Sequence, residues 1–244
     1  MQGIFSDNFL ISQLEKFKLS QVVDLQSIKG IIRSWNEELN STKLLKEKEE
    51  AIKSRFISEI FGDVLGFNYG NSRRWLLREE VKTSVNSKKP DAALGYFSVD
   101  NSNNIKNDVR AVIEMKDANT DLDKPQKRKN QNISPVQQAF GYAPDMGGSC
   151  KWVIVSNLLE IRFYHYDDRS KYERFLLTDL QDELILKKFL FLFHKDRFIH
   201  QEKSHTERLY EANKNYIHQE GKDISWIRCM NASKNLKALA LLTL

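Results

Sequence analysis

Two stretches of sequence decide the fold, KKPDAAL at residues 88–94 and VRAVIEMK at residues 109–116. Both are rich in small or branched apolar residues, which is typical of strands buried inside a sheet. Between them, DNSNNIKN at residues 100–107 indicates the turn-rich tip of a hairpin. Proline fits the first position of a strand, so Asp91 begins the first of the two strands. The chain should therefore place Asp91 and Glu114 on neighbouring strands, near the same edge.

The pattern on either side of this hairpin predicts an α/β fold, in which helices flank a mixed β-sheet and a helical segment precedes it. A period of two predicts strands, and apolar residues at helical spacing predict helices. Asp24 and Ser134 are expected to cap helices, Gly62 and Gly66 to break one, and the polar residues 117–132 to form a loop. The predicted helices are 24–40, 41–61, 134–145 and 180–193, and the predicted strands are 75–81, 91–99, 109–115, 152–156 and 159–165.

The composition limits the function classes. The 244 residues are 41% hydrophobic, which is enough for one substantial core, and the net charge of +5 favours a polyanionic partner weakly. No apolar run reaches the roughly 18 residues that a membrane-spanning helix needs, and the first residues do not resemble a signal peptide, so a cytoplasmic location is expected. Cys150 and Cys229 have no neighbouring ligand residues, which excludes a zinc ribbon and indicates two reduced cysteines.

An acid followed two residues later by a base is common in this chain. The 33 acidic and 38 basic residues would produce the pattern about five times by chance. Glu80/Lys82 and Glu160/Arg162 are two such pairs, but no Pro-Asp precedes Glu80 in a pairing strand, and Glu160/Arg162 comes late in the chain and lacks a partner acid. Glu114 and Lys116 differ because they end an apolar strand and, since side chains alternate along a strand, point to the same face.

Asp91, Glu114 and Lys116 together form a candidate catalytic site. Two carboxylates suit a hard divalent cation, and one ammonium lies nearby. The alternative is structural, because a buried acid and lysine at a strand end are costly unless they pair or bind a metal. In that case Glu114 and Lys116 form only an ion pair.

Pro90-Asp91 followed by Glu114-Met115-Lys116 resembles the signature of PD-(D/E)XK nucleases. The helix after it carries Gln138-Ala139-Phe140-Gly141-Tyr142, which resembles the QxxxY motif of type I restriction subunits and of fused type IIG restriction–modification enzymes. Gln138 and Tyr142 share one helix face. The resemblance covers roughly residues 40–200 and implies a restriction-endonuclease-like core at 41–200, between an N-terminal helical segment at 1–40 and a helical linker remnant at 201–244.

The resemblance implies a Mg²⁺-dependent DNA endonuclease, with Mn²⁺ as a substitute metal, that leaves 5′-phosphate and 3′-hydroxyl ends. Asp91, Glu114 and the Met115 carbonyl would hold the metal, Lys116 would orient water or stabilise the transition state, and Gln138 would assist. Tyr142 would support Gln138 by packing. Glu59, an acid on the preceding helix, is a further candidate for the metal shell.

The expected partner is double-stranded DNA. Lys88, Lys89, Lys124, Lys127, Arg128 and Lys129 would contact its phosphates, which provides affinity without sequence information. Type IIG enzymes continue into a methyltransferase and a target-recognition domain, and neither motif is present here, so residues 221–244 are interpreted as the tail of a truncated or frame-shifted product. The resemblance also admits a homodimer during cleavage. The alternative function is a non-catalytic remnant that binds DNA or another subunit.

Overall fold

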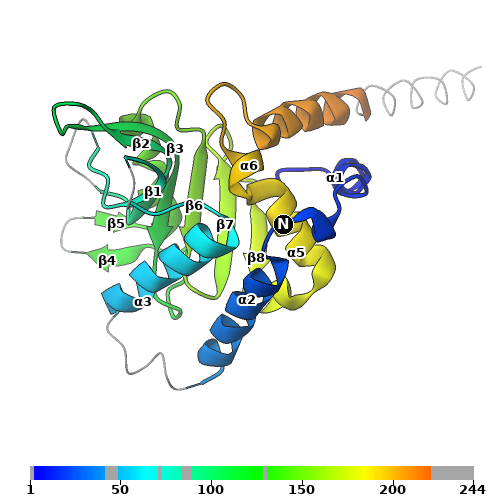
Figure 1. Cartoon of the computed structure of the whole chain (residues 1–244), viewed down its shortest axis with the longest axis horizontal. Coiled ribbons are helices and arrows are strands. Elements are labelled where there is room, and N and C mark those ends of the chain that lie inside the picture. Colours follow the sequence, from blue (N-terminus) through cyan, green and yellow to red (C-terminus); the bar gives the residue numbers. More distant parts are fainter. Residues whose placement is uncertain (1–2, 42–48, 71–72, 84–88, 129–130, 221–244) are drawn as a thin grey trace, which may run out of the picture.

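A six-stranded mixed sheet with helices on both faces forms the centre of the molecule, so the predicted α/β class is confirmed (Figure 1). The computed structural model describes residues 3–41, 49–70, 73–83, 89–128 and 131–220. The strands lie in the order β1-β2-β3-β6-β7-β8, and β4 and β5 form a separate two-stranded sheet. The predicted tail at 221–244 and Cys229 lie outside the described residues.

The predicted hairpin is the first half of the sheet. β1 (Arg74–Glu79), β2 (Ala92–Val99) and β3 (Ile105–Met115) are antiparallel neighbours. The hairpin tip is shorter than predicted, because β3 begins at Ile105 and only residues 100–104 turn. Asp100 closes that turn by accepting hydrogen bonds from the backbone N–H groups of Ser102 and Asn104. In this turn, the Asp100 carboxylate accepts the backbone hydrogen bonds that a neighbouring strand would otherwise accept.

A crossover connects the two halves of the sheet. The loop predicted at 117–132 is wrong in part, because it contains β4 (Gln126–Arg128) and β5 (Gln131–Ile133), which pair with each other. α4 (Pro135–Phe140) then begins at Ser134, as predicted, with a reciprocal capping box between Ser134 and Gln137. The α-helix ends earlier than the predicted Asp145, and a 3₁₀ turn, η4 (Ala143–Met146), follows it.

The second half of the sheet is β6 (Trp152–Ser156), β7 (Glu160–His165) and β8 (Glu173–Leu176). β6 runs parallel to β3, and β7 and β8 continue antiparallel. β8 was not predicted, because its four residues are too few to display an alternating pattern. Asn157 closes the β6–β7 turn by accepting hydrogen bonds from the N–H groups of Leu159 and Glu160.

The two faces of the sheet bury different sets of side chains. Ala111, Ile113 and Met115 of β3 face a large hydrophobic cluster that is covered by helices, whereas Val109 and Val112 face a smaller cluster under α4 and η4. The helices on the first face are visible in Figure 1. They are α1 (Asp7–Leu14), α2 (Leu25–Leu39), α3 (Glu49–Phe56), η3 (Ile57–Val64), α5 (Glu183–Phe193) and α6 (Lys195–Phe198).

Two features of the N-terminal helices differ from expectation. Asp24 does occupy the cap position of α2, but its side chain accepts no capping hydrogen bond and its backbone is left-handed (φ 58°). Gly62 does not break the second helix, which continues as the π-helix η3 to Val64, and the left-handed Gly66 (φ 80°) follows its C-cap, Leu65. A glycine inside a helix costs only about 1 kcal/mol, and the burial of the apolar face of η3 outweighs that cost.

The predicted domain boundaries at residues 40 and 200 fall inside one continuous core. Ile32 and Trp35 from the N-terminal segment, and Leu209 and Tyr210 from the helix at 205–220, belong to the same hydrophobic cluster as the sheet. The three segments therefore pack as one body. None of the described helices is both long and apolar enough to cross a membrane.

Candidate functional site

Asp91 lies next to the end of β3, as the hairpin predicts. Ala92 pairs with Ile113, and continuing this antiparallel register by one residue sets Asp91 opposite Glu114. Cross-strand neighbours project to the same face of a sheet. The Oδ2 atom of Asp91 accepts a hydrogen bond of 2.6 Å from the backbone N–H of Met115. The aspartate is therefore tied to the residue between Glu114 and Lys116.

Glu114 and Lys116 form a buried ion pair between Oε1 and Nζ. Their side chains are 2% and 6% exposed, so the pair is almost fully removed from water. The backbone N–H of Lys116 donates to the carbonyl of Ser156 at 2.8 Å, which extends the β3–β6 pairing past the end of the strand. The structure thus brings Asp91, Glu114 and Lys116 together.

A cavity of about 300 Å³ opens beside Asp91, between α3 and the ends of β1 and β2. Of the three candidate residues, Asp91 alone is among the described side chains that line it. One of the three candidate side chains thus lies at the wall of a surface cavity. The other charged or polar side chains that line this cavity are Glu50, Lys53, Ser54, Glu79, Glu80 and Lys89.

The two QxxxY residues lie on the same face of the sheet as Glu114. α4 packs over β3 and β6, and Tyr142 is buried in the smaller cluster with Val112. The Nε2 atom of Gln138 donates to the hydroxyl of Tyr142 at 2.7 Å, as their spacing of four residues allows. This contact holds the amide of Gln138 in one orientation.

Glu59 does not join this group. Its Oε2 accepts a hydrogen bond of 2.7 Å from the indole N–H of Trp35, so the carboxylate faces α2. The helical acid that shares a cavity with Asp91 is Glu50, about two and a half turns earlier. The sequence alone does not distinguish Glu50 from Glu59. Which of the two acids lies near Asp91 depends on how the helix packs on the sheet.

The predicted DNA-contacting residues are only partly described. Lys88 and Lys129, and the side chains of Lys127 and Arg128 on β4, lie outside the described part of the chain. Lys89 pairs with Glu80 at 3.0 Å beside the cavity. Lys124 pairs with Asp121 at 2.9 Å, and the hydrogen bond to this carboxylate raises the pKa of Lys124.

A second acid–x–base pair lies on the same face, two strands away. Arg162 on β7 donates through Nη2 to Glu160 at 2.8 Å, and through Nη1 to both oxygens of Asp123 at 3.0 and 2.9 Å. Arg174 on β8 binds the other oxygen of Glu160. Burial alone would lower the pKa of Arg162, but its hydrogen bond to Glu160 raises it. The expectation that Glu160/Arg162 lacks a partner acid is therefore wrong.

The sequence does not indicate Asp123 as a partner of Arg162, because Asp123 lies in the polar loop, 39 residues before Arg162. The only local signal was the alternation along β7, which puts Glu160, Arg162 and Tyr164 on one face.

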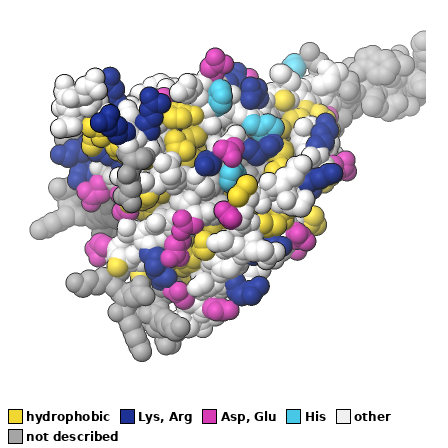
Figure 2. Space-filling view, viewed as in Figure 1, with side chains coloured by type: hydrophobic (Ala, Val, Ile, Leu, Met, Phe, Trp, Pro, Cys, Tyr) yellow, Lys and Arg dark blue, Asp and Glu magenta, His cyan; other side chains and the backbone are white. Residues whose placement is uncertain are grey.

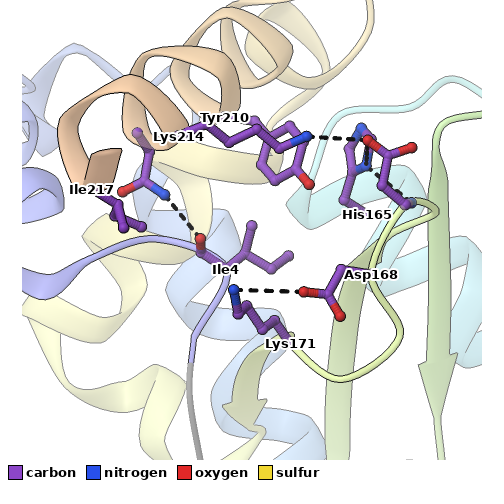
Figure 3. Close-up of a pocket in the computed structure, with 9 residues that line it drawn as sticks. Ile4, His165, Asp168, Lys171, Tyr210, Lys214 and Ile217 are labelled. Carbon is purple, nitrogen blue, oxygen red and sulfur yellow. Dashed lines mark hydrogen bonds and ion pairs between the residues drawn. The ribbon is translucent and has the colours of Figure 1, made fainter. Parts of the chain in front are cut away.

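Another cavity of about 300 Å³ lies between β7, the N-terminal segment and the helix at 205–220 (Figure 3). Its lysines are paired, Lys214 with Asp167 at 3.2 Å and Lys171 with Asp168 at 3.6 Å. His165 stacks on Tyr210, and burial lowers the pKa of His165 to about 4, so the ring is neutral near pH 7. Because each of these lysines is paired with an aspartate, the cavity is interpreted as a stabilising contact between the helix at 205–220 and the end of β7.

The donor set near Asp91 fits a hard divalent cation. Carboxylate oxygens from Asp91 and Glu114 and a backbone carbonyl from Met115 are the ligand types that Mg²⁺ prefers. Within the described residues, no group of three or more His, Cys, Asp or Glu side chains is arranged to hold a metal ion. A cation here would depend on two carboxylates, the carbonyl and water. In comparisons with known proteins, no family model, no curated protein and no solved structure matches this chain.

Proposed function

We propose that this chain is a Mg²⁺-dependent DNA endonuclease domain with a restriction-endonuclease-like core, similar to the nuclease region of type IIG enzymes. The single observation that carries the proposal is the placement of Asp91 across from Glu114, with Lys116 on the same face. Residues 23 positions apart in sequence meet there, and Asp91 opens to a cavity at the sheet edge.

Each residue would have a distinct role. Asp91, Glu114 and the Met115 carbonyl would hold the metal, and when bound the metal would lower the pKa of water and offset charge on the scissile phosphate. Lys116 would place its ammonium where the phosphate becomes more negative during attack by water. Gln138, oriented by Tyr142, would donate to the phosphate or the attacking water.

The substrate would be double-stranded DNA, with cleavage to 5′-phosphate and 3′-hydroxyl ends. Basic side chains gather over the tip of the β2–β3 hairpin, where Arg73, Arg74 and Lys106 are exposed (Figure 2). With Lys89 and Lys124, they would contact phosphates without reading sequence. A separate methyltransferase or target-recognition domain would supply specificity, and two copies would pair to cut both strands.

One observation favours a second candidate, a non-catalytic module that binds DNA or another subunit. Lys116 and Glu114 satisfy each other's charge while buried, which is also the arrangement of a structural ion pair. For catalysis, Lys116 must exchange part of its contact with Glu114 for the phosphate.

The test is cleavage of supercoiled plasmid with Mg²⁺ or Mn²⁺ by the wild type, Asp91→Asn and Asp108→Asn. Asp91→Asn is expected to reduce the rate at least about 100-fold, because metal stabilisation of charge amounts to several kcal/mol. Asp108 is the matched control: it is a half-exposed carboxylate at the other end of the same sheet region, and it pairs with Arg110.

Asp108→Asn should cleave like the wild type. Equal activity of Asp91→Asn and the wild type would refute the site. DNA binding without cleavage by any form would instead favour the non-catalytic module.

A further inference from the structure

We propose that Arg162 is a positioning residue that, through Asp123, holds the loop at 117–125 in place at the end of the candidate catalytic strand. This inference rests on the proposed function, since the loop begins at the residue after Lys116. It adds two residues from outside the Asp91–Glu114–Lys116 group, one on β7 and one in the loop.

Three side-chain attachments, among others, hold the loop against the body of the protein. Asn157, in the β6–β7 turn, donates through Nδ2 to the carbonyl of Thr120 at 2.9 Å. Leu122 is buried in the smaller hydrophobic cluster. Asp123 receives Nη1 of Arg162 on both carboxylate oxygens. The last attachment is the only one of the three that depends on charge.

Arg162 is suited to a fixed position. Its side chain is 7% exposed, Glu160 holds Nη2 at 2.8 Å, and its guanidinium lies 4.8 Å from the ring centre of Tyr172. An arginine with several directional contacts loses little freedom on binding one more group. Asp123 is 65% exposed. The ion pair therefore joins a fixed arginine on the sheet to an aspartate on an exposed loop.

The register links this anchor to the candidate site. Glu114 pairs with Val155 on β6, and Val155 pairs with Arg162 on β7. In-register neighbours project to one face, so Glu114 and Arg162 lie on the same face about 10 Å apart, the width of two strand spacings. Asn157, which anchors Thr120, follows β6 beside Lys116, whose N–H bonds to Ser156. The loop is thus held on the side of the sheet where Glu114 and Lys116 project.

This placement predicts an effect on the chemical step. A shift of about 1 Å in groups that position a substrate costs as much as 100-fold in rate. Release of Asp123 removes the charged attachment, while Asn157 still binds Thr120 and Leu122 stays buried. The Lys116 end of β3 should then sample more positions, while the buried core remains unchanged.

The experiment compares Asp123→Ala with Arg174→Gln in the full chain. Asp123→Ala removes the anchor and should lower the melting temperature only modestly, because Arg162 keeps its hydrogen bond to Glu160. Arg174 binds the same Glu160 but makes no contact with Asp123 among the described interactions, so Arg174→Gln is the matched control. Asp123→Glu keeps the carboxylate and tests rescue.

Two readouts are needed. Hydrogen exchange of residues 117–125 should be about tenfold faster in Asp123→Ala, as expected for the loss of a charged hydrogen bond. Single-turnover cleavage of plasmid at saturating protein should be about 10- to 100-fold slower, with DNA affinity unchanged. Arg174→Gln should resemble the wild type in both, and Asp123→Glu should recover most of the rate.

The outcomes separate the two proposals. An inactive wild type would refute the endonuclease and, with it, the positioning role. An active wild type with equal exchange and equal rates in Asp123→Ala would refute the positioning role alone. A slower rate that is accompanied by a large fall in melting temperature, without rescue by Asp123→Glu, would also refute it.

Discussion

Glu114/Lys116 on β3 and Glu160/Arg162 on β7 share one sequence pattern, one face of the sheet and nearly complete burial. Their surroundings differ. Glu160 and Arg162 belong to a network in which Arg174 and Asp123 complete the charges. Glu114 and Lys116 pair with each other, and Asp91 across the strand brings a second carboxylate to the same place. Among the interactions described for these residues, the β7 network holds two acids and two bases, which suits structure, whereas the β3 group holds two carboxylates and one ammonium, a set that suits a cation.

Substitution of Lys116 should produce the largest effect in this comparison. Lys116→Met should destabilise the protein by about 3–5 kcal/mol, because it removes the ammonium that offsets the buried charge of Glu114. The double variant Glu114→Gln/Lys116→Met should regain most of that free energy of unfolding, since both charges are removed. Denaturant titration measures this difference.

Cleavage separates a structural role of the Glu114–Lys116 pair from a catalytic one. The double variant should fold but cleave plasmid at least about 100-fold more slowly than the wild type, because it loses both a proposed metal ligand and a proposed donor to the transition state. A stable double variant with normal cleavage would show that Glu114 and Lys116, like Glu160 and Arg162, have only a structural role.

Arg162→Met should have a smaller effect on stability than Lys116→Met. Glu160 keeps Arg174, and the exposed Asp123 can return to water. We expect a loss of about 1–3 kcal/mol, the range for hydrogen bonds to charged groups. Urea unfolding of the two single variants under the same conditions compares the pairs directly. A loss for Arg162→Met that exceeds the loss for Lys116→Met would contradict the difference in charge balance.

The pH dependence of the β7 network should be the smallest effect. Burial alone would raise the pKa of Glu160, but hydrogen bonds from Arg162 and Arg174 outweigh burial and lower it. A carboxylate with a lowered folded-state pKa stabilises the protein above its unfolded pKa, and this contribution is lost as the pH falls through the folded value. The free-energy difference between wild type and Glu160→Gln should be constant near neutral pH and shrink in acid, below the usual glutamate pKa of about 4.3. A difference that grows in acid would show that Glu160 is not held charged.

The sequence predicts the features that depend on local periodicity and on short-range geometry. The strands around Asp91 and Glu114, the capping of α4 by Ser134, and the pairing of Gln138 with Tyr142 all follow from residues within one turn or one hairpin. It does not predict elements whose existence depends on distant packing. Gly62 is tolerated inside η3, and β8 exists because β7 offers it an edge.

By itself, the sequence determined that Asp91 and Glu114 would be neighbours, because a hairpin register links them with no help from the rest of the chain. Only the tertiary structure decided which other charges surround them. It turned Glu59 toward Trp35, brought Glu50 to the cavity of Asp91, and joined Asp123 to Arg162. The physical reason is that ion pairs between distant segments depend on how helices and loops pack on the sheet, and an alternating pattern carries no information about that packing.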